Sequence, residues 1–231
     1  MKKDSRILVL GNNTAIGKSI IDRLKEKKYS CILNFNVVKN KLLTHEKINH
    51  FFNKNKPEYI FLCHGITGGI LFNQKFPADL MNSNMNSLIN IIPLAYKYKV
   101  KKLIYFASSC VYPKNSNKLL KTSNLLGGHL EQTNLHYAVS KISGMILCDA
   151  YNKQYNTSFI PVIPSNYFGP DDEFNLQNSH LISALINKMH YAKLERKKNI
   201  KIWGSGKPIR DFTYLKDIAG AGIFIMKKYK K

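Results

Sequence analysis

Short apolar runs alternate with helical patterns along most of this 231-residue chain, and this alternation restricts the fold more than any other feature. The first run, RILVLG, is rich in aliphatic residues and meets a turn at Gly11. From Ala15 to Lys28, apolar residues then recur at helical spacing. Strand and helix patterns alternate in this way five times, which predicts a parallel sheet with helices on both faces.

The remaining predicted elements continue the same order. Strands are expected at residues 31–35, 58–63, 102–107 and 159–164, and helices at residues 44–55, 77–98 and 135–155. Because Pro93 lacks a backbone donor inside the long third helix, a kink or break costing about 3 kcal/mol is expected there. The predicted fold class is therefore α/β, a Rossmann-like doubly wound parallel sheet. Ligands of such sheets bind at the carboxyl ends of the strands.

Composition bears on the partners and the compartment. A net charge of +22 suggests nucleic acid, but only four of the 36 basic residues are arginine and the lysines are spread along the whole chain. We therefore expect no specific nucleic-acid partner. No apolar run approaches the length of a membrane span, so no membrane association is expected. Residues Met1 to Ser5 lack a signal peptide's apolar segment, so a cytoplasmic location is expected, in which the four widely spaced cysteines would be free thiols.

The segment GNNTAIG, Gly11 to Gly17, lies between the first strand and the first helix. At this point a dinucleotide's pyrophosphate meets backbone amides and the positive end of the helix. An ordinary strand-to-helix turn is the alternative. The second strand is not followed by the Asp or Glu that would hold an adenosine ribose, and Lys39 and Lys41 come instead. This favours NADP(H) over NAD.

A second candidate site is HYAVSKISG, in which Tyr137 and Lys141 are four residues apart and share one helix face. A nearby ammonium is expected to lower the pKa of the tyrosine from its usual value of about 10. Such a tyrosine can pass a proton to a carbonyl oxygen while hydride reaches the carbon. The pair alone is common by chance, but it follows a serine at a strand end, in YFASSC, and a glycine turn.

This order of features resembles the extended short-chain dehydrogenase/reductases, whose serine, tyrosine and lysine correspond to Ser108, Tyr137 and Lys141. Within them, the chain is similar to the GDP-L-fucose synthase family in SSCVYPK, LEQTNLHYAVSKISGMILCDAYNKQY, PSNYFGPDDEFNLQNSHLI and WGSGKPIRDFTYLKDIA. The resemblance implies an NADP(H)-dependent epimerase-reductase that converts GDP-4-keto-6-deoxy-D-mannose, or a related GDP-sugar, by C3/C5 epimerisation and C4 reduction. It also implies that no metal is needed and that the protein is a homodimer built on long helices.

The resemblance assigns catalysis to five residues. Ser108 would bond the keto oxygen beside Tyr137, and Lys141 would assist the tyrosine. Cys110 and His180 would be the acid-base pair of epimerisation. The chemistry is coherent, because a ketone at C4 acidifies the protons at C3 and C5, so that a base on one face and an acid on the other can invert a centre. Cysteine and histidine can both do this near neutral pH.

The resemblance also implies two binding sets. The cofactor set is Gly11, Asn12, Asn13, Thr14, Ala15, Ile16, Gly17, Ala107, Ser108, Tyr137, Lys141, Pro164, Asn166, Tyr167 and His180. The substrate set is Ser109, Lys188, Trp203 and Arg210. Lys188 replaces the family's usual arginine, so a bidentate fork becomes a point charge. Trp203 could equally be a core aromatic residue.

Three departures from the family leave alternatives open: Thr14 in the glycine turn, the absence of arginines near the adenosine phosphate, and a substrate-binding region that is only partial. Thr14 stands at the family's middle glycine, where a β-branched side chain can obstruct the pyrophosphate. We expect a dinucleotide-binding domain at residues 1–165. Residues 166–231 are expected to form a partial sugar-nucleotide region with a last strand and helix that return to the first domain. The alternatives are a non-catalytic nucleotide-binding or interaction protein, and a relative that performs one step on another sugar.

Overall fold

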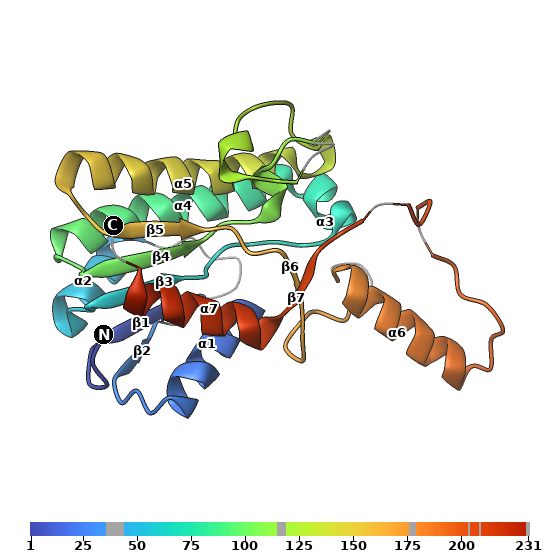
Figure 1. The fold of residues 1–231 in the computed structure, drawn as a ribbon, viewed down its shortest axis with the longest axis horizontal. Coiled ribbons are helices and arrows are strands. Elements are labelled where there is room, and N and C mark those ends of the chain that lie inside the picture. The colour runs from blue at the N-terminus through green and yellow to red at the C-terminus, as the bar shows by residue number, and fades with distance from the viewer. Residues whose placement is uncertain (36–43, 115–118, 176–178, 203, 208, 230–231) are drawn as a thin grey trace.

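The computed structural model describes residues 1–35, 44–114, 119–175, 179–202, 204–207 and 209–229 (Figure 1). Within these residues, five strands form a parallel sheet in the order β2-β1-β3-β4-β5. The order changes direction beside β1, which makes the sheet doubly wound and confirms the predicted fold class. The strands are β1 (Ile7–Leu10), β2 (Ile32–Asn34), β3 (Tyr59–Leu62), β4 (Lys102–Phe106) and β5 (Phe159–Val162).

Helices cover both faces of this sheet (Figure 1). On one face lie α2 (His45–Asn55), α4 (Pro77–Lys97) and α5 (Leu135–Tyr155), and on the other lie α1 (Ala15–Glu26) and α7 (Leu215–Lys228). Side chains of β1 alternate between the two layers: Leu8 and Leu10 join the first core, and Ile7 and Val9 join the second. All four are fully buried, as expected of a parallel strand covered on both sides.

The long helix α4 continues past Pro93 to Lys97, so the helix does not break at this proline, and the kink that was the other expectation stays a prediction. Proline removes one backbone donor, but the neighbouring residues Ile91, Ile92 and Leu94 are buried in the core that α4 shares with the sheet. Tertiary packing of this kind routinely overrides local propensity. The helix expected at residues 135–155 is observed with the same bounds, as α5.

Several elements beyond the five strand–helix units were not predicted as such. These are α3 (Ile70–Lys75), the short 3₁₀ helices η1 (Ser109–Val111), η2 (Thr122–Asn124) and η3 (Gln132–Asn134), strand β6 (Asn166–Phe168) and helix α6 (Leu181–Leu194). β6 pairs in parallel with β7 (Phe212–Tyr214), and α6 stands away from the body of the molecule (Figure 1). The last strand and helix are β7 and α7, and α7 packs against α1. The domain boundary at residue 165 stays a prediction.

Helix α5 lies very close to strand β4 at Gly144. A Cβ atom at this position would lie 2.5 Å from a ring carbon of Tyr105, a buried residue of β4. The Tyr105 hydroxyl in turn donates to the Lys141 carbonyl over 3.5 Å. This contact fixes the helix that carries Tyr137 and Lys141 against the strand that leads to Ser108.

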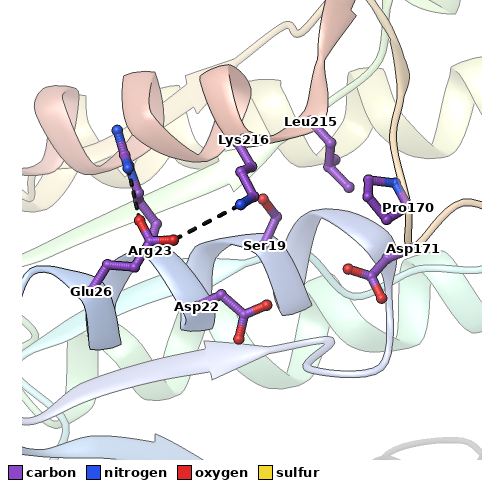
Figure 2. A pocket seen from close by; sticks show the side chains of 8 residues that line it. All are labelled: Ser19, Asp22, Arg23, Glu26, Pro170, Asp171, Leu215 and Lys216. Atoms are coloured by element: carbon purple, nitrogen blue, oxygen red, sulfur yellow. Dashed lines mark hydrogen bonds and ion pairs between the residues drawn. The ribbon is translucent and has the colours of Figure 1, made fainter.

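The seam between α1, the turn at Pro170–Asp171 and the start of α7 encloses a small cavity of about 30 Å³ (Figure 2). Glu26 contacts Arg23 at 2.7 Å and Lys216 at 4.0 Å. Such exposed ion pairs contribute little to stability. The cavity is far too small for a nucleotide, so we interpret it as part of the joint that holds α7 on α1.

None of the helices in the described part of the chain combines the length and the apolarity that a membrane crossing requires.

Candidate active site

The site is built at the carboxyl end of β4. There the chain turns into η1, and the side chain of Ser108 caps this turn by accepting a hydrogen bond of 3.3 Å from the Cys110 amide. Ser108, Ser109 and Cys110 are half-buried. Their place at a strand end in a doubly wound sheet is where ligands of this fold bind.

Tyr137, in the first turn of α5, meets this strand end. Its phenol oxygen is hydrogen-bonded by the side chains of Ser108 and Thr67, and it lies close enough to Cys110 for the two groups to interact electrostatically. Burial raises the pKa of Tyr137 to about 12, and the electrostatic interaction with Cys110 also raises it. The hydrogen bonds with Thr67 and Ser108 lower it. The structure therefore brings Ser108, Cys110 and Tyr137 together, with the tyrosine in its protonated form.

Lys141 lies one turn further along α5 and is only 6% exposed. Its ammonium donates to the Phe106 carbonyl over 3.0 Å and lies 5.7 Å from the centre of the Tyr137 ring. Burial lowers the pKa of Lys141 to about 8, against a small opposing effect of Cys63. The expectation that this lysine lowers the pKa of Tyr137 is not met: burial of the phenol raises that pKa, and the groups that lower it are the hydroxyls of Thr67 and Ser108.

The loop after β3 supplies residues that the sequence patterns did not single out. Asn84 of α4 is buried and holds Ile66 through both backbone groups: the Ile66 amide donates to Oδ1 over 2.8 Å, and Nδ2 donates to the Ile66 carbonyl over 3.1 Å. This clamp positions the adjoining Thr67 against Tyr137. The available signal was the segment CHGITGG, which follows the third strand as SSC follows the fourth.

The glycine turn between β1 and α1 is tightly closed. Gly11 has φ +88°, and a Cβ atom there would lie 2.6 Å from the His64 amide nitrogen. At Gly17 a Cβ atom would lie 2.0 Å from the Gly11 carbonyl oxygen. Neither position has room for another residue, so the backbone itself forms the floor of this turn.

Thr14 is the N-cap of α1. Its hydroxyl donates to the Gly11 carbonyl over 2.7 Å and accepts from the Gly17 amide over 3.1 Å, so it is held inside the turn. The amides of Ala15 and Ile16, in the first turn of the helix, have no acceptor within the helix. Such groups bind phosphate readily, so the turn fits a dinucleotide's pyrophosphate. Obstruction by Thr14 stays a prediction. Beside it, Asn12 is half-buried and Asn13 is exposed.

His180 is connected to the cluster around Tyr137 through Tyr167 of β6. The two rings are edge to face, with their centres 5.8 Å apart. Burial raises the pKa of Tyr167, and the proximity of Asp172 and Tyr137 raises it further. Tyr167 therefore interacts both with His180, the N-cap residue of α6, and with Tyr137. Asn166 donates to the Asp211 carbonyl over 3.3 Å, and Pro164 is half-buried.

The residues expected to bind the sugar nucleotide are less well defined. Lys188 of α6 donates to the Lys201 carbonyl over 3.1 Å, and Arg210 donates to the Ile209 carbonyl over 2.8 Å. Trp203 lies outside the described residues. The substrate-binding roles of these residues and of Ser109 stay predictions, as do the roles of the cofactor set.

A glycine turn after the first strand, with Ser108, Tyr137 and Lys141 gathered at the end of β4, defines the class of short-chain dehydrogenase/reductases. The chain belongs to the NAD dependent epimerase/dehydratase family, a model of which matches residues 7–231. It is 39% identical over 226 residues to a GDP-L-fucose synthase of Sinorhizobium fredii, covering 98% of this chain and 72% of that relative.

Two solved structures resemble the chain closely in fold. A GDP-L-fucose synthetase of Naegleria fowleri bound to NADP has a TM-score of 0.88 at 28% identity, and the match covers all of this chain and 75% of that one. A GDP-mannoheptose C4 reductase of Campylobacter jejuni with NADP bound has a TM-score of 0.88 at 28% identity, covering 98% and 76%.

Proposed function

We propose that the chain is an NADP(H)-dependent GDP-sugar epimerase-reductase of the GDP-L-fucose synthase type. Its substrate would be GDP-4-keto-6-deoxy-D-mannose or a related GDP-keto-sugar, epimerised at C3 and C5 and reduced at C4. The observation that carries the proposal is the contact of Tyr137 with Ser108, with Cys110 beside it and the buried Lys141 behind it. The relative and the two structural neighbours named above support the substrate class and the cofactor.

The cofactor's pyrophosphate would lie on the glycine turn, held by the amides of Ala15 and Ile16 at the positive end of α1. NADPH supplies, when bound, the hydride that converts the C4 ketone to an alcohol. Lys141 and Tyr137 lie at the end of β4, where they would hold the nicotinamide end. The fit rests on the closed geometry at Gly11 and Gly17.

Tyr137 would act as the acid of the reduction. Because its pKa is about 12, the phenol keeps its proton at neutral pH and can give it to the C4 oxygen. Ser108 would donate a hydrogen bond to the same oxygen. The Lys141 ammonium would stabilise the phenolate that remains, and solvent would restore the proton.

Epimerisation would use Cys110 and His180. One of them removes the proton from C3 or C5, the C–H bond breaks, and its electron pair moves into an enolate whose charge lies on the C4 oxygen. Ser108 and Tyr137 stabilise this charge by hydrogen bonding. The other residue then delivers a proton to the opposite face of the same carbon, which inverts the centre.

Replacing Cys110 by alanine should separate the two reactions. We expect Cys110→Ala to lower proton exchange at C3 and C5 by about 10²- to 10³-fold, because one acid-base group is lost, whereas C4 reduction continues on the unepimerised sugar. Deuterium incorporation in D₂O, followed by NMR, measures the first step, and oxidation of NADPH measures the second. Cys31→Ala, just before β2, is the control.

Exchange at the wild-type rate in Cys110→Ala would remove this cysteine from the mechanism. If the wild-type chain bound NADPH but neither exchanged nor reduced any GDP-keto-sugar, the non-catalytic alternative would replace the proposal.

We also propose that the chain forms a homodimer through α4 and α5, which lie side by side (Figure 1). Their outer faces carry apolar side chains that are 41–58% exposed in the single chain: Ile89, Tyr96, Ile146 and Tyr155. Sedimentation equilibrium should give twice the chain mass of 26.5 kDa. Ile89→Lys combined with Ile146→Lys should give a monomer, and a monomeric wild type would contradict the proposal.

A cytoplasmic location is proposed on the state of the thiols. All four cysteines, Cys31, Cys63, Cys110 and Cys148, are free. Free thiols are typical of compartments kept reducing by glutathione and thioredoxin. An acid-base role for Cys110 also requires a thiol that is not held in a disulfide.

A further inference from the structure

The N-cap residue of α5 does not cap its helix. Asn134 is one of the residue types that cap helices best, yet its side chain makes no capping hydrogen bond. Instead, Nδ2 of Asn134 is directed at Cys110, with 3.8 Å between Nδ2 and Sγ. The Asn134 side chain, which could accept from the first amides of the helix, thus donates to a sulfur atom at the candidate site instead.

A second asparagine fixes the direction of this side chain. Asn73 of α3 donates from Nδ2 to the Asn134 Oδ1 over 2.8 Å. With Oδ1 engaged as an acceptor, the NH₂ group of Asn134 has to face Cys110. Asn73 is only 6% exposed, and within the described residues its own Oδ1 is buried without a partner. An unpaired buried oxygen is costly, so Asn73 is not a residue that packing alone would favour.

From this chain of contacts we infer that Asn134 is a positioning residue for Cys110, oriented by Asn73. Its N–H donates to the sulfur, and hydrogen bonds of this kind are stronger when the acceptor carries a negative charge. It also holds the sulfur at the edge of the site beside Tyr137. The inference rests on the proposed function for its catalytic meaning, because a thiolate at residue 110 is the base that epimerisation would use.

The test is the rate at which Cys110 reacts with iodoacetamide, a reaction of the thiolate in which sulfur displaces iodide. In a Cys31→Ser background, with Cys63 and Cys148 buried, peptide mass spectrometry reports Cys110 alone. We expect Asn134→Ala to lower the alkylation rate about tenfold at pH 7, as for a lost hydrogen bond to a charged group. Asn73→Ala should lower the rate less, because Asn134 can then rotate.

Two further variants keep the result interpretable. Asn134→Asp retains a good N-cap and the shape of the side chain but replaces the NH₂ donor by a negative oxygen, so it should react more slowly still. Thr44→Ala removes the N-cap of α2, which also makes no capping hydrogen bond, and should react like the parent. Equal alkylation rates in Asn134→Ala, Asn134→Asp and the parent would overturn the inference.

The outcomes separate this inference from the proposed function, because alkylation requires neither cofactor nor sugar. If the variants were alkylated more slowly than the parent but the parent had no turnover, the role of Asn134 would stand and the proposed function would fall. Unchanged alkylation with normal wild-type turnover would do the reverse. If the role of Asn134 and the proposed function both hold, Asn134→Ala should lower deuterium exchange at C3 and C5 more than it lowers C4 reduction.

Discussion

Phenylalanine in place of Tyr137 is expected to lower kcat for the keto-sugar by about 10³-fold, within the range of 10²- to 10⁴-fold that a lost general acid produces. No other group at this place can supply the proton, since the Ser108 hydroxyl is a weaker acid than the phenol. The Lys141 ammonium donates to the Phe106 carbonyl instead. NADPH oxidation measures kcat. Cofactor affinity, measured by fluorescence titration, should change little, because the ring is retained.

Tyr105→Phe is the matched control for this experiment. It removes another buried tyrosine hydroxyl, whose hydrogen bond goes to the backbone of α5, at the Lys141 carbonyl. Turnover of Tyr105→Phe should therefore stay within a few-fold of the wild type. A Tyr137→Phe variant that kept a tenth or more of the wild-type kcat would show that another group protonates the ketone.

Alanine in place of Gly11 is expected to lower the free energy of unfolding by about 3 kcal/mol or more, the largest loss among the variants considered. Its φ of +88° costs a side chain about 1–3 kcal/mol, and its Cβ would meet the backbone of Cys63 and His64 at 2.6–2.8 Å. Backbone atoms at the end of a buried strand cannot move aside cheaply. Urea denaturation measures the change, and NADPH titration should show weakened or absent binding, because the turn that receives the pyrophosphate is displaced.

Gly204→Ala separates the cost of the positive φ from the cost of the steric contact. Gly204 has a φ of +87°, almost that of Gly11, but a Cβ atom there would meet nothing within 4 Å. Its loss of stability should therefore reflect the backbone conformation alone and should be clearly smaller than that of Gly11→Ala. Equal losses in the two variants would show that the contact with His64 contributes nothing.

The part of the fold that the sequence predicts well is the part with regular periodicity. Buried parallel strands such as β1 consist of aliphatic runs, and α5 has the predicted bounds at both ends. By contrast, α6 buries only Ser183 and Ala192. Its apolar side chains, such as Leu181, Ile186 and Met189, are exposed and are not gathered into the single stripe from which a surface helix is recognised. Strands β6 and β7 have three residues each, too few for a pattern.

At the candidate site, the residues found from the sequence are those in recognisable runs. Ser108, Cys110, Tyr137 and Lys141 could be named because their spacing and resemblance were visible. Thr67, Asn84 and Asn134 could not, since each acts through a contact between segments that are distant in the sequence. The direction of the Tyr137 pKa was also wrong, because burial is a property of the fold and spacing along a helix does not reveal it.

The close contact of Gly144 with Tyr105 has a consequence for how such a chain can change over time. The two positions share one fixed volume between α5 and β4, so added bulk at one must be offset by lost bulk at the other. A larger residue at position 144 alone would tilt α5 and separate its tyrosine and lysine from the end of the neighbouring strand. A smaller residue at position 105 therefore has to arise first, so the order of the two changes determines whether the intermediate protein survives.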